Sequence, residues 1–474
     1  MTYIHIIIAL IYVVLVVATT LSVLMENRQP EKTVAWVFVL LFVPVFGMII
    51  YFFFGRDTRR ERVIGKHSMD QLSRRQMLGF VEQKGFVIPE KHKTLVNLFY
   101  NQNEALPFKD NEVEMYTNGY DFVFALLRDI ASAKSHIHIC SYIFDDDSLG
   151  ALLSDALIDK AHQGVEVRVI FDDVGCWKVK DSFFERMRFE GIEVHSFMPV
   201  KFPAFTGKVN YRNHRKIIVI DGIAGYIGGM NIARRYVQGS GKQKWRDTHM
   251  RITGAAVYGL QRTFLIDWFF VDGSLITNNK YYPRIPSHIS NNCVIQIVVS
   301  SPIAPWPDIM QGYVRILLSA EKYVYIETPY FLPTEPILFA MRTAALAGVD
   351  VVLMIPMHSD SKMIEWVGNS FVRQTLDSGV KVMLYEKGFN HSKLLISDDA
   401  LCTCGSTNVD FRSFENNFES NAFIYDREMS LKMKEIFKED LRYCVPLSEH
   451  KIMSQYGFFR RLGESVLRLL SPLF

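Results

Sequence analysis

Two short segments of the chain carry the same polar side chains at the same spacing. Each reads H-x-K-x-x-x-x-D, and each is followed at one fixed distance by an asparagine after a small-residue turn. The eight residues are His214, Lys216, Asp221 and Asn231 in the first copy, and His391, Lys393, Asp398 and Asn408 in the second. A single copy would fit a hydrogen-bonded core histidine, but two copies inside a longer repeat indicate one shared site.

The side chains of such a site suit a phosphate group. Residues two apart on a strand project to the same face, so each histidine lies beside its lysine. Two ammonium groups would repel a metal ion but attract phosphate oxygens, and the amides of Asn231 and Asn408 can donate to the same oxygens. One neutral imidazole can attack phosphorus while the other, protonated, protonates the leaving alkoxide. The pattern therefore predicts transfer at phosphorus without a metal or other cofactor.

Four carboxylates accompany the motifs. Asp247 and Glu419 each precede an apolar strand, and we expect them to orient the imidazoles, because a nucleophilic histidine needs its second ring nitrogen held. Asp221 and Asp398 are counted in the candidate catalytic set with the two histidines and two lysines because they complete the motif. Since each sits at a turn and falls on the opposite strand face, we interpret both as structural residues that anchor the strand.

The elements that position these residues form an internal repeat. Blocks of strand and helix recur in the same order, as in residues 133–144 and 320–331, and an apolar run follows each histidine and lysine. This pattern predicts an α/β fold with two related domains, residues 111–290 and 291–474, packed about a pseudo-twofold axis. Such packing would bring the two motif strands face to face.

The apolar excess of the chain is concentrated at its N-terminus. Residues 3–25 contain no Lys, Arg, Asp or Glu, and at ~1.5 Å per residue they reach about 34 Å, enough to cross a bilayer. A second apolar run at residues 34–54 argues against a cleaved signal peptide. We therefore expect a two-helix transmembrane hairpin over residues 1–58 and a juxtamembrane linker over residues 59–110. Arginines clustered within residues 55–66 place the remainder in the cytoplasm by the positive-inside rule.

The remaining composition narrows the function classes. A net charge of +3 gives no general positive field that would attract nucleic acid. The six cysteines form no C-x-x-C pair, so we interpret them as small buried side chains of a protein in a reducing compartment. Basic and aromatic residues mix in residues 198–216, which suits an anionic membrane surface, the alternative being an ordinary exposed loop. Residues 456–474 are amphipathic, which suits a helix in the membrane interface or one docked on the core.

The motifs and their neighbours resemble those of bacterial cardiolipin synthases, a branch of the phospholipase D superfamily. The segments that carry the resemblance are "NYRNHRKIIVIDG", "GGMNIARRY", "WRDTHMRITG", "IETPYFLP", "FNHSKLLISDD" and "GSTNVDFRSFENNFE". The resemblance implies two phospholipase D-like domains that transfer a phosphatidyl group from one phosphatidylglycerol to another, giving cardiolipin and glycerol through a phosphatidyl-histidine. It also implies His214 as nucleophile and His391 as general acid and base, although the symmetry leaves the order open.

The partners implied are phosphatidylglycerol, cardiolipin and the bilayer, with no nucleic acid and with an oligomer possible. Two alternatives stay open from the sequence. A hydrolase of the same superfamily would use water as acceptor, on phospholipid or nucleic acid, although a nuclease needs no membrane spans and would carry a broader basic stripe. A membrane-anchored scaffold with a dead site would lack a histidine, lysine or asparagine of the motifs, and all six are present.

Overall fold

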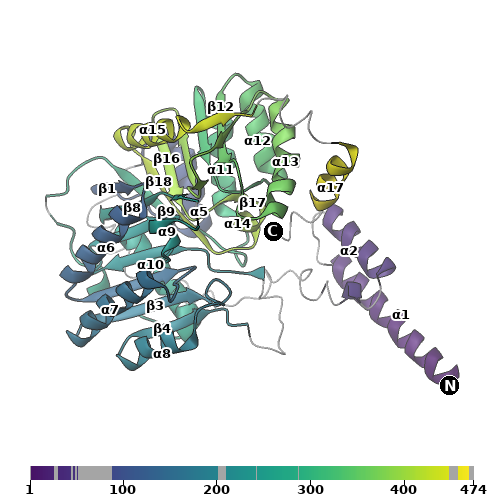
Figure 1. Ribbon diagram of the computed structural model, residues 1–474, viewed down its shortest axis with the longest axis horizontal. Coiled ribbons are helices and arrows are strands. Elements are labelled where there is room, and N and C mark those ends of the chain that lie inside the picture. The colour runs from purple at the N-terminus through teal and green to yellow at the C-terminus, as the bar shows by residue number, and fades with distance from the viewer. Residues whose placement is uncertain are drawn as a thin grey trace.

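The computed structural model describes residues 2–25, 30–43, 46–48, 51, 88–200, 210–241, 243–286, 288–447 and 457–468. Two α/β domains lie one above the other in Figure 1, with two N-terminal helices projecting to one side. These helices are α1 (Thr2–Met25) and α2 (Pro30–Phe42). The mixed sheets of the two domains and the apolar helix before them give the fold class that the sequence predicts.

The first domain is built on a seven-stranded mixed sheet. Its strands in spatial order are β1 (Asn111–Tyr116), β8 (His249–Gly254), β6 (Ala224–Gly228), β5 (Lys216–Ile220), β2 (His136–Ser141), β3 (Glu166–Asp172) and β4 (Glu193–Phe197). The helices of this part are α6 (Gly119–Ser132), α7 (Ser148–His162), α8 (Asp181–Phe189), α9 (Arg235–Gln238) and α10 (Val257–Asp272), with the short η5 (Asn279–Tyr281). Strands β2, β3 and β4 are parallel, and β5 runs antiparallel to β2.

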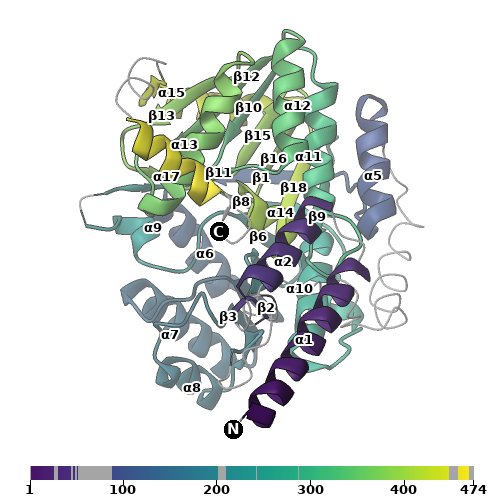
Figure 2. The same cartoon turned by 90° about the vertical axis from the view of Figure 1, so that its right-hand side faces the viewer.

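The second sheet repeats this order and adds one edge strand. Its strands are β9 (Val294–Ser300), β18 (Glu419–Tyr425), β16 (Leu401–Gly405), β15 (Leu394–Ser397), β10 (Tyr323–Glu327), β12 (Asp350–Pro356), β13 (Lys381–Tyr385) and β19 (Cys444–Pro446). The helices are η3 (Glu90–His92), α5 (Lys93–Asn103), α11 (Asp308–Ser319), α12 (Glu335–Leu346), α13 (Lys362–Leu376), α14 (Phe411–Glu415), α15 (Arg427–Leu441) and α17 (Phe458–Arg468). Figure 2 shows α11, α12 and α13 standing against this sheet.

The two sheets share one hydrophobic core. Ile217 and Ile227 of the first sheet belong to the same buried cluster as Ile396 and Cys404 of the second. The facing strands are apolar on both sides, and their side chains leave water together when the domains pack, which stabilises the pair as one unit. The end of the segment predicted as a linker, α5, also packs against the second domain, through the buried Leu95, Val96 and Phe99.

The N-terminal helices pack against each other around Val23, Leu40 and Tyr51. Within α1, His5–Met25 is long and apolar enough to cross a membrane. Parts of the second predicted span, residues 44–45, 49–50 and 52–54, lie outside the described residues, as does the arginine cluster at 55–66. The same holds for residues 201–209 of the basic and aromatic stretch and for residues 456 and 469–474 of the amphipathic C-terminus.

Candidate active site

Both motifs lie at the carboxyl end of parallel strands, where α/β sheets bind their ligands. Lys216 opens β5 and pairs with Ser141, the last residue of β2. Leu394 opens β15 beside Glu327, the last residue of β10, so Lys393 lies just beyond that strand. The buried apolar strands behind the motifs fix the direction in which the histidines and lysines point.

The backbone ties each motif to the opposite domain. His214 N–H donates to the carbonyl of Phe418 at 2.9 Å, and His391 N–H donates to the carbonyl of Arg246 at 2.6 Å. The second contact extends a short parallel pair formed by β7 (Trp245–Arg246) and β14 (Phe389–Asn390). Phe418 immediately precedes Glu419, so the contact places that carboxylate beside His214. The contacts are reciprocal, as a pseudo-twofold arrangement requires.

The consequence is a crossed pair of histidine–carboxylate contacts. Nδ1 of His214 lies 3.0 and 3.1 Å from the two carboxylate oxygens of Glu419, and Nδ1 of His391 lies 2.7 Å from Oδ2 of Asp247. The sequence singles out both carboxylates but does not assign each to its histidine, because the pairing runs between domains. With Nδ1 engaged, Nε2 of each ring is the nitrogen available for chemistry.

The two lysines are buried beside the histidines. Lys216 and Lys393 are 2% and 1% exposed, so their ammonium groups have little water around them. Each Nζ donates to the carbonyl of the histidine two residues earlier, at 2.6 Å for Lys216. Nζ of Lys393 also lies 2.8 Å from Nδ1 of His391, so this ring nitrogen sits between an ammonium and a carboxylate. Only the carboxylate can accept the Nδ1 proton.

Burial dominates the electrostatics of the site. It lowers the pKa of Lys216 to about 7, partly offset by Glu419 and reinforced by Lys393, and it lowers the pKa of Lys393 to about 8. Burial also lowers the pKa of His214 to about 4 against the pull of Glu419, and that of His391 to about 3, with Lys393 adding to the effect. Both imidazoles are therefore neutral near pH 7 and can act as nucleophiles.

The orienting carboxylates stay ionised. Burial works against the charge on Glu419, but His214 and Lys216 outweigh it and the pKa of that carboxyl is lowered. Burial likewise works against Asp247, and Lys393 and His391 lower its pKa. Because lysines of both domains act on the same groups, the two half-sites form a single electrostatic unit.

The two motif aspartates are separated from this unit. Asp221 accepts backbone N–H groups of Lys134, Ser135 and His136 at 2.8, 2.7 and 2.9 Å, at the far end of β5 from His214. Asp398 does the same for Glu321, Lys322 and Tyr323 at 2.8 to 2.9 Å. Of the catalytic set taken from the motif, these two touch neither imidazole. They join the turn after the motif strand to the start of the neighbouring strand.

The two asparagines differ in their bonding. Asn231 uses its amide inside the protein: Oδ1 accepts from the N–H of Ile143 at 3.1 Å, and Nδ2 donates to the hydroxyl of Tyr236 at 2.6 Å. Asn408 is equally buried, but among the described residues its Oδ1 has no hydrogen-bond partner. Contact of either amide with substrate stays a prediction, and Asn408 has the greater free capacity.

Sequence reasoning misses the groups that surround the histidines. Tyr142 lies edge-on to His214 with 5.0 Å between ring centroids, and Trp245 and Tyr236 lie 5.4 and 5.9 Å from His391. The Ser406 hydroxyl donates to Glu419, in the small-residue turn that precedes Asn408. The sequence could have pointed to Ser406, because the equivalent residue in the first motif is a glycine, Gly229, and the two turns differ at this position.

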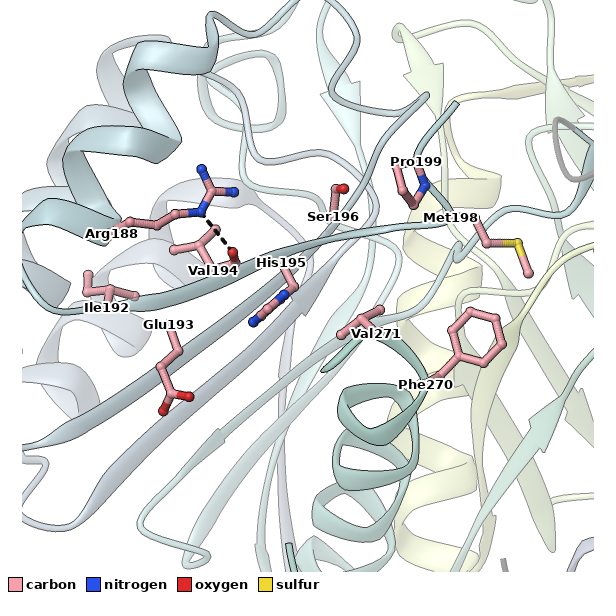
Figure 3. A pocket seen from close by; sticks show the side chains of 10 residues that line it. All are labelled: Arg188, Ile192, Glu193, Val194, His195, Ser196, Met198, Pro199, Phe270 and Val271. Carbon is pink, nitrogen blue, oxygen red and sulfur yellow. Dashed lines mark hydrogen bonds between the residues drawn. The ribbon is translucent and has the colours of Figure 1, made fainter. Parts of the chain in front are cut away.

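Of two cavities in the described α/β domains, the smaller borders the site. One of about 690 Å³ opens along the edge strand β4 and the end of α10, and Figure 3 shows that none of the motif residues lines it. The other, of about 610 Å³, is lined by residues that include Tyr330, Met357 and Gly368. The Tyr330 ring lies 6.4 Å from that of His391, so the second cavity borders the site.

Comparison with known proteins gives one consistent family. A family model described as "Cardiolipin synthase, PLD-like domain" matches residues 126–258 and again 313–441, and a "Phospholipase_D-nuclease N-terminal" model matches residues 6–56. A "Cardiolipin synthase" of Listeria monocytogenes serotype 4a (strain HCC23) is 37% identical over 95% of both chains. The "Major cardiolipin synthase ClsA" of Bacillus subtilis (strain 168) is 36% identical over 99% of both.

A solved structure supports the fold independently. The phosphatidylserine synthase of Haemophilus influenzae Rd KW20 superimposes with a TM-score of 0.62 over 80% of this chain and 100% of that one, at 17% identity. At this identity the likeness concerns the arrangement of helices and strands alone.

Proposed function

The chain belongs to the cardiolipin synthase family of phosphatidyltransferases, and from that premise we propose that both its donor and its acceptor are phosphatidylglycerol. Nε2 of His214 attacks the donor phosphorus, the bond from phosphorus to the glycerol oxygen breaks, and His391 gives that oxygen a proton. The product of this half-reaction is a phosphatidyl-histidine and free glycerol. His391 then takes a proton from a hydroxyl of the second phosphatidylglycerol, whose oxygen displaces His214 and forms cardiolipin.

The crossed histidine–carboxylate contacts carry this proposal. Each imidazole has Nδ1 held by a buried carboxylate, at 3.0 Å for His214 and 2.7 Å for His391, so each presents Nε2 in a fixed orientation. A carboxylate on Nδ1 also stabilises the positive charge that develops on the ring during attack or proton transfer. A site with two such rings can divide nucleophile and acid between them without any further group.

The lysines suit a phosphodiester. With an anionic phosphate bound, Lys216 and Lys393 bring two positive charges into a buried space, where each interacts more strongly with phosphate oxygens than it would in water. An anionic phosphate in turn raises the pKa of the nearby histidines, which allows His391 to carry the proton that the leaving glycerol requires. Oδ1 of Asn408, which has no partner in the part of the chain that the structure describes, leaves an acceptor for a substrate hydroxyl.

We further propose that residues 1–58 form a hairpin that crosses the membrane twice and that the two α/β domains face the cytoplasm. The described part of α1 supports a first span, and the arginine-rich sequence after the second apolar run supports the orientation. This arrangement holds the site at the surface where its lipid substrate resides.

The test is a product assay. Purified protein in mixed micelles of detergent and phosphatidylglycerol should release cardiolipin and glycerol in equal amounts, with no added nucleotide and with a chelator of divalent metal ions present. Phosphatidic acid as the only lipid product would show a hydrolase. Phosphatidyl label that survives denaturation of wild type but is lost in His214→Ala would support the covalent intermediate.

A further inference from the structure

The last described helix, α17, packs Leu467 against the core but also buries a charged side chain and exposes two apolar ones, unlike a typical surface helix of a water-soluble protein. Its Glu464 is fully buried and accepts a hydrogen bond at 2.5 Å from Arg373 of α13. Its Leu462 and Val466 are 50% and 54% exposed. A surface helix in water normally buries its apolar stripe and exposes its charges, so this orientation indicates an apolar environment on the outer side.

Charged contacts fix the rotation of α17 about its axis. Nε of Arg460 lies 3.5 Å from Oε1 of Glu464, and its guanidinium lies 5.3 Å from the centre of the Trp366 ring. The guanidinium of Arg468 lies 4.6 Å from the centre of the Phe371 ring. Turning Leu462 and Val466 inward would expel these groups and leave Arg373 without its buried partner, which is costly.

The helix α17 lies on the same side of the molecule as the N-terminal helices α1 and α2. Figure 1 shows α17, α1 and α2 on the right, and in Figure 2, turned by 90°, all three face the viewer. The neighbouring α13 adds Met363 and Trp366, which are 45% and 38% exposed. Tryptophan is enriched where proteins meet the lipid head groups, because its ring is apolar with one polar edge.

We propose that Leu462, Val466, Met363 and Trp366 form a membrane-contact surface that inserts into the interfacial layer of the bilayer. Because Arg460 and Arg468 turn toward α13, this contact depends on apolar insertion and not on attraction to anionic head groups. The same α13 lines the 610 Å³ cavity that borders His391, so the contact holds this cavity beside the lipid. The inference concerns the partner of a surface and does not rest on the identity of donor and acceptor.

Depth-dependent quenching tests the contact in the full chain. A fluorophore is placed at Leu462→Cys or Val466→Cys, with Cys444 changed to serine, and the protein is reconstituted into phosphatidylcholine vesicles with or without phosphatidylglycerol. The control is Glu428→Cys on α15, whose side chain is 77% exposed. Lipid-attached nitroxide should quench the two α17 labels at least twofold more than the control, equally in both vesicle types, and aqueous iodide should show the reverse order.

The other results each overturn the proposal. Iodide quenching equal to that of the control would mean that the face is in water. Shielding from both quenchers would mean that a second copy of the chain or another part of the protein covers it. A strong requirement for phosphatidylglycerol would replace apolar insertion with charge attraction.

An activity assay gives a second readout. The double variant Leu462→Glu/Val466→Glu should lose at least fivefold in transfer rate in vesicles but less than twofold in detergent micelles. Leu152→Glu on α7, an apolar position that is also 50% exposed but lies in the first domain, should change neither rate by more than twofold. Equal losses in vesicles and micelles would contradict a role at the membrane, whereas an inactive wild-type protein in micelles would count against the proposed function alone.

Discussion

The two half-sites each pair a histidine with a buried carboxylate but hold that carboxylate differently. In one, Glu419 reaches His214 with both oxygens, and the side chains of Ser406 and Asn417 donate to it. In the other, the shorter Asp247 contacts His391 through Oδ2, and its Oδ1 accepts a hydrogen bond from the backbone N–H of Thr248. The longer side chain has more rotational freedom and is restrained by two side-chain donors, and the shorter one is restrained by the backbone.

The residue beneath each carboxylate explains why one half-site has an aspartate and the other a glutamate. A Cβ atom added at Gly229 would lie 2.1 Å from Oδ1 of Asp247, so glycine is required beneath the aspartate. The equivalent position in the second domain is Ser406, whose side chain coexists with Glu419 because it donates to it. Each carboxylate is thus matched to its own turn, and the repeat has diverged in pairs of residues. The comparison raises the question of whether the two histidines have also diverged in role.

The largest effect is expected from separating these roles with a better leaving group. On a phosphatidyl ester of p-nitrophenol, whose phenolate departs without a proton, His391→Ala should keep a burst of nitrophenolate within about tenfold of wild type. On phosphatidylglycerol the same variant should lose about 10³-fold, since general acid catalysis contributes that much. His214→Ala should lose about 10⁵-fold or more on both substrates, because no nucleophile remains.

Rapid-quench measurement of the first turnover provides the readout. The reverse pattern, with His214→Ala rescued and His391→Ala dead, would make His391 the nucleophile. Equal rescue of both variants would mean that the half-sites are interchangeable, and the asymmetry of their carboxylates would then have no catalytic meaning.

The next effect concerns the turns beneath the carboxylates. Gly229→Ser should reduce kcat about 10²-fold, because the new side chain displaces Asp247 and misaligns His391. Ser406→Ala should cost only about tenfold, because it removes one hydrogen bond to a charged group while the Asn417 amide remains.

A swap controls for general damage. Adding Asp247→Glu to Gly229→Ser gives the first domain the pair found in the second, and steady-state assays should recover part of the lost kcat. A double variant no better than Gly229→Ser, or a Gly229→Ser variant near wild type, would contradict the matching of carboxylate to turn.

Most of the fold could be predicted from the sequence because the repeat shows in apolar strands of fixed order. The block at residues 133–144 and its counterpart at 320–331 become β2 and β10, and the apolar runs after each motif become β5 and β15. The packing of α5 on the second domain could not be predicted, since it depends on a long-range contact with α11. The rotation of α17 also depends on long-range partners in α13, among them Arg373 and Trp366.

The candidate site, like the fold, could be predicted only in part from the sequence. Residue types and spacing suffice to select His214, His391 and their lysines, because strand periodicity places them together. The pairing of Glu419 with His214 could not be predicted, since the strand that carries the glutamate belongs to the other domain. Three of the aromatic rings around His391, those of Tyr236, Trp245 and Tyr330, come from separate segments, and no local pattern in the sequence joins them.

The two lysines should give the enzyme an alkaline limit. Since burial lowers the pKa of Lys216 to about 7 and that of Lys393 to about 8, both are charged below these values and lose their charge as the pH rises through them. The value of kcat/KM, which reports the free enzyme, should fall by up to tenfold per pH unit for each lysine above pH 8. The limit of kcat should lie at higher pH, because bound phosphate restores the pKa of both groups.

Rates across pH 6–10 in a neutral detergent would test this. The two lysines differ in pKa, so Lys216→Met should remove the transition near pH 7 and leave the one near pH 8 that belongs to Lys393. A kcat/KM that stays flat to pH 10 would show that the lysines keep their charge in spite of burial.

The smallest effect on catalysis is expected at the motif aspartates, where the two domains do not differ. Asp221 and Asp398 each accept three backbone N–H groups and each adopts a positive φ, of 54° and 53°. Asparagine tolerates this backbone but brings one acceptor oxygen and no charge, so Asp221→Asn and Asp398→Asn should each cost about 2–4 kcal/mol of stability. At temperatures where the variants stay folded, kcat and KM should remain within about twofold of wild type.

Thermal unfolding monitored beside activity separates the two effects: a variant with an unchanged melting temperature and a kcat reduced 10²-fold would place its aspartate in the chemistry. Equal melting losses in the two domains, set against unequal losses for Gly229→Ser and Ser406→Ala, would confine the divergence of the repeat to the active site.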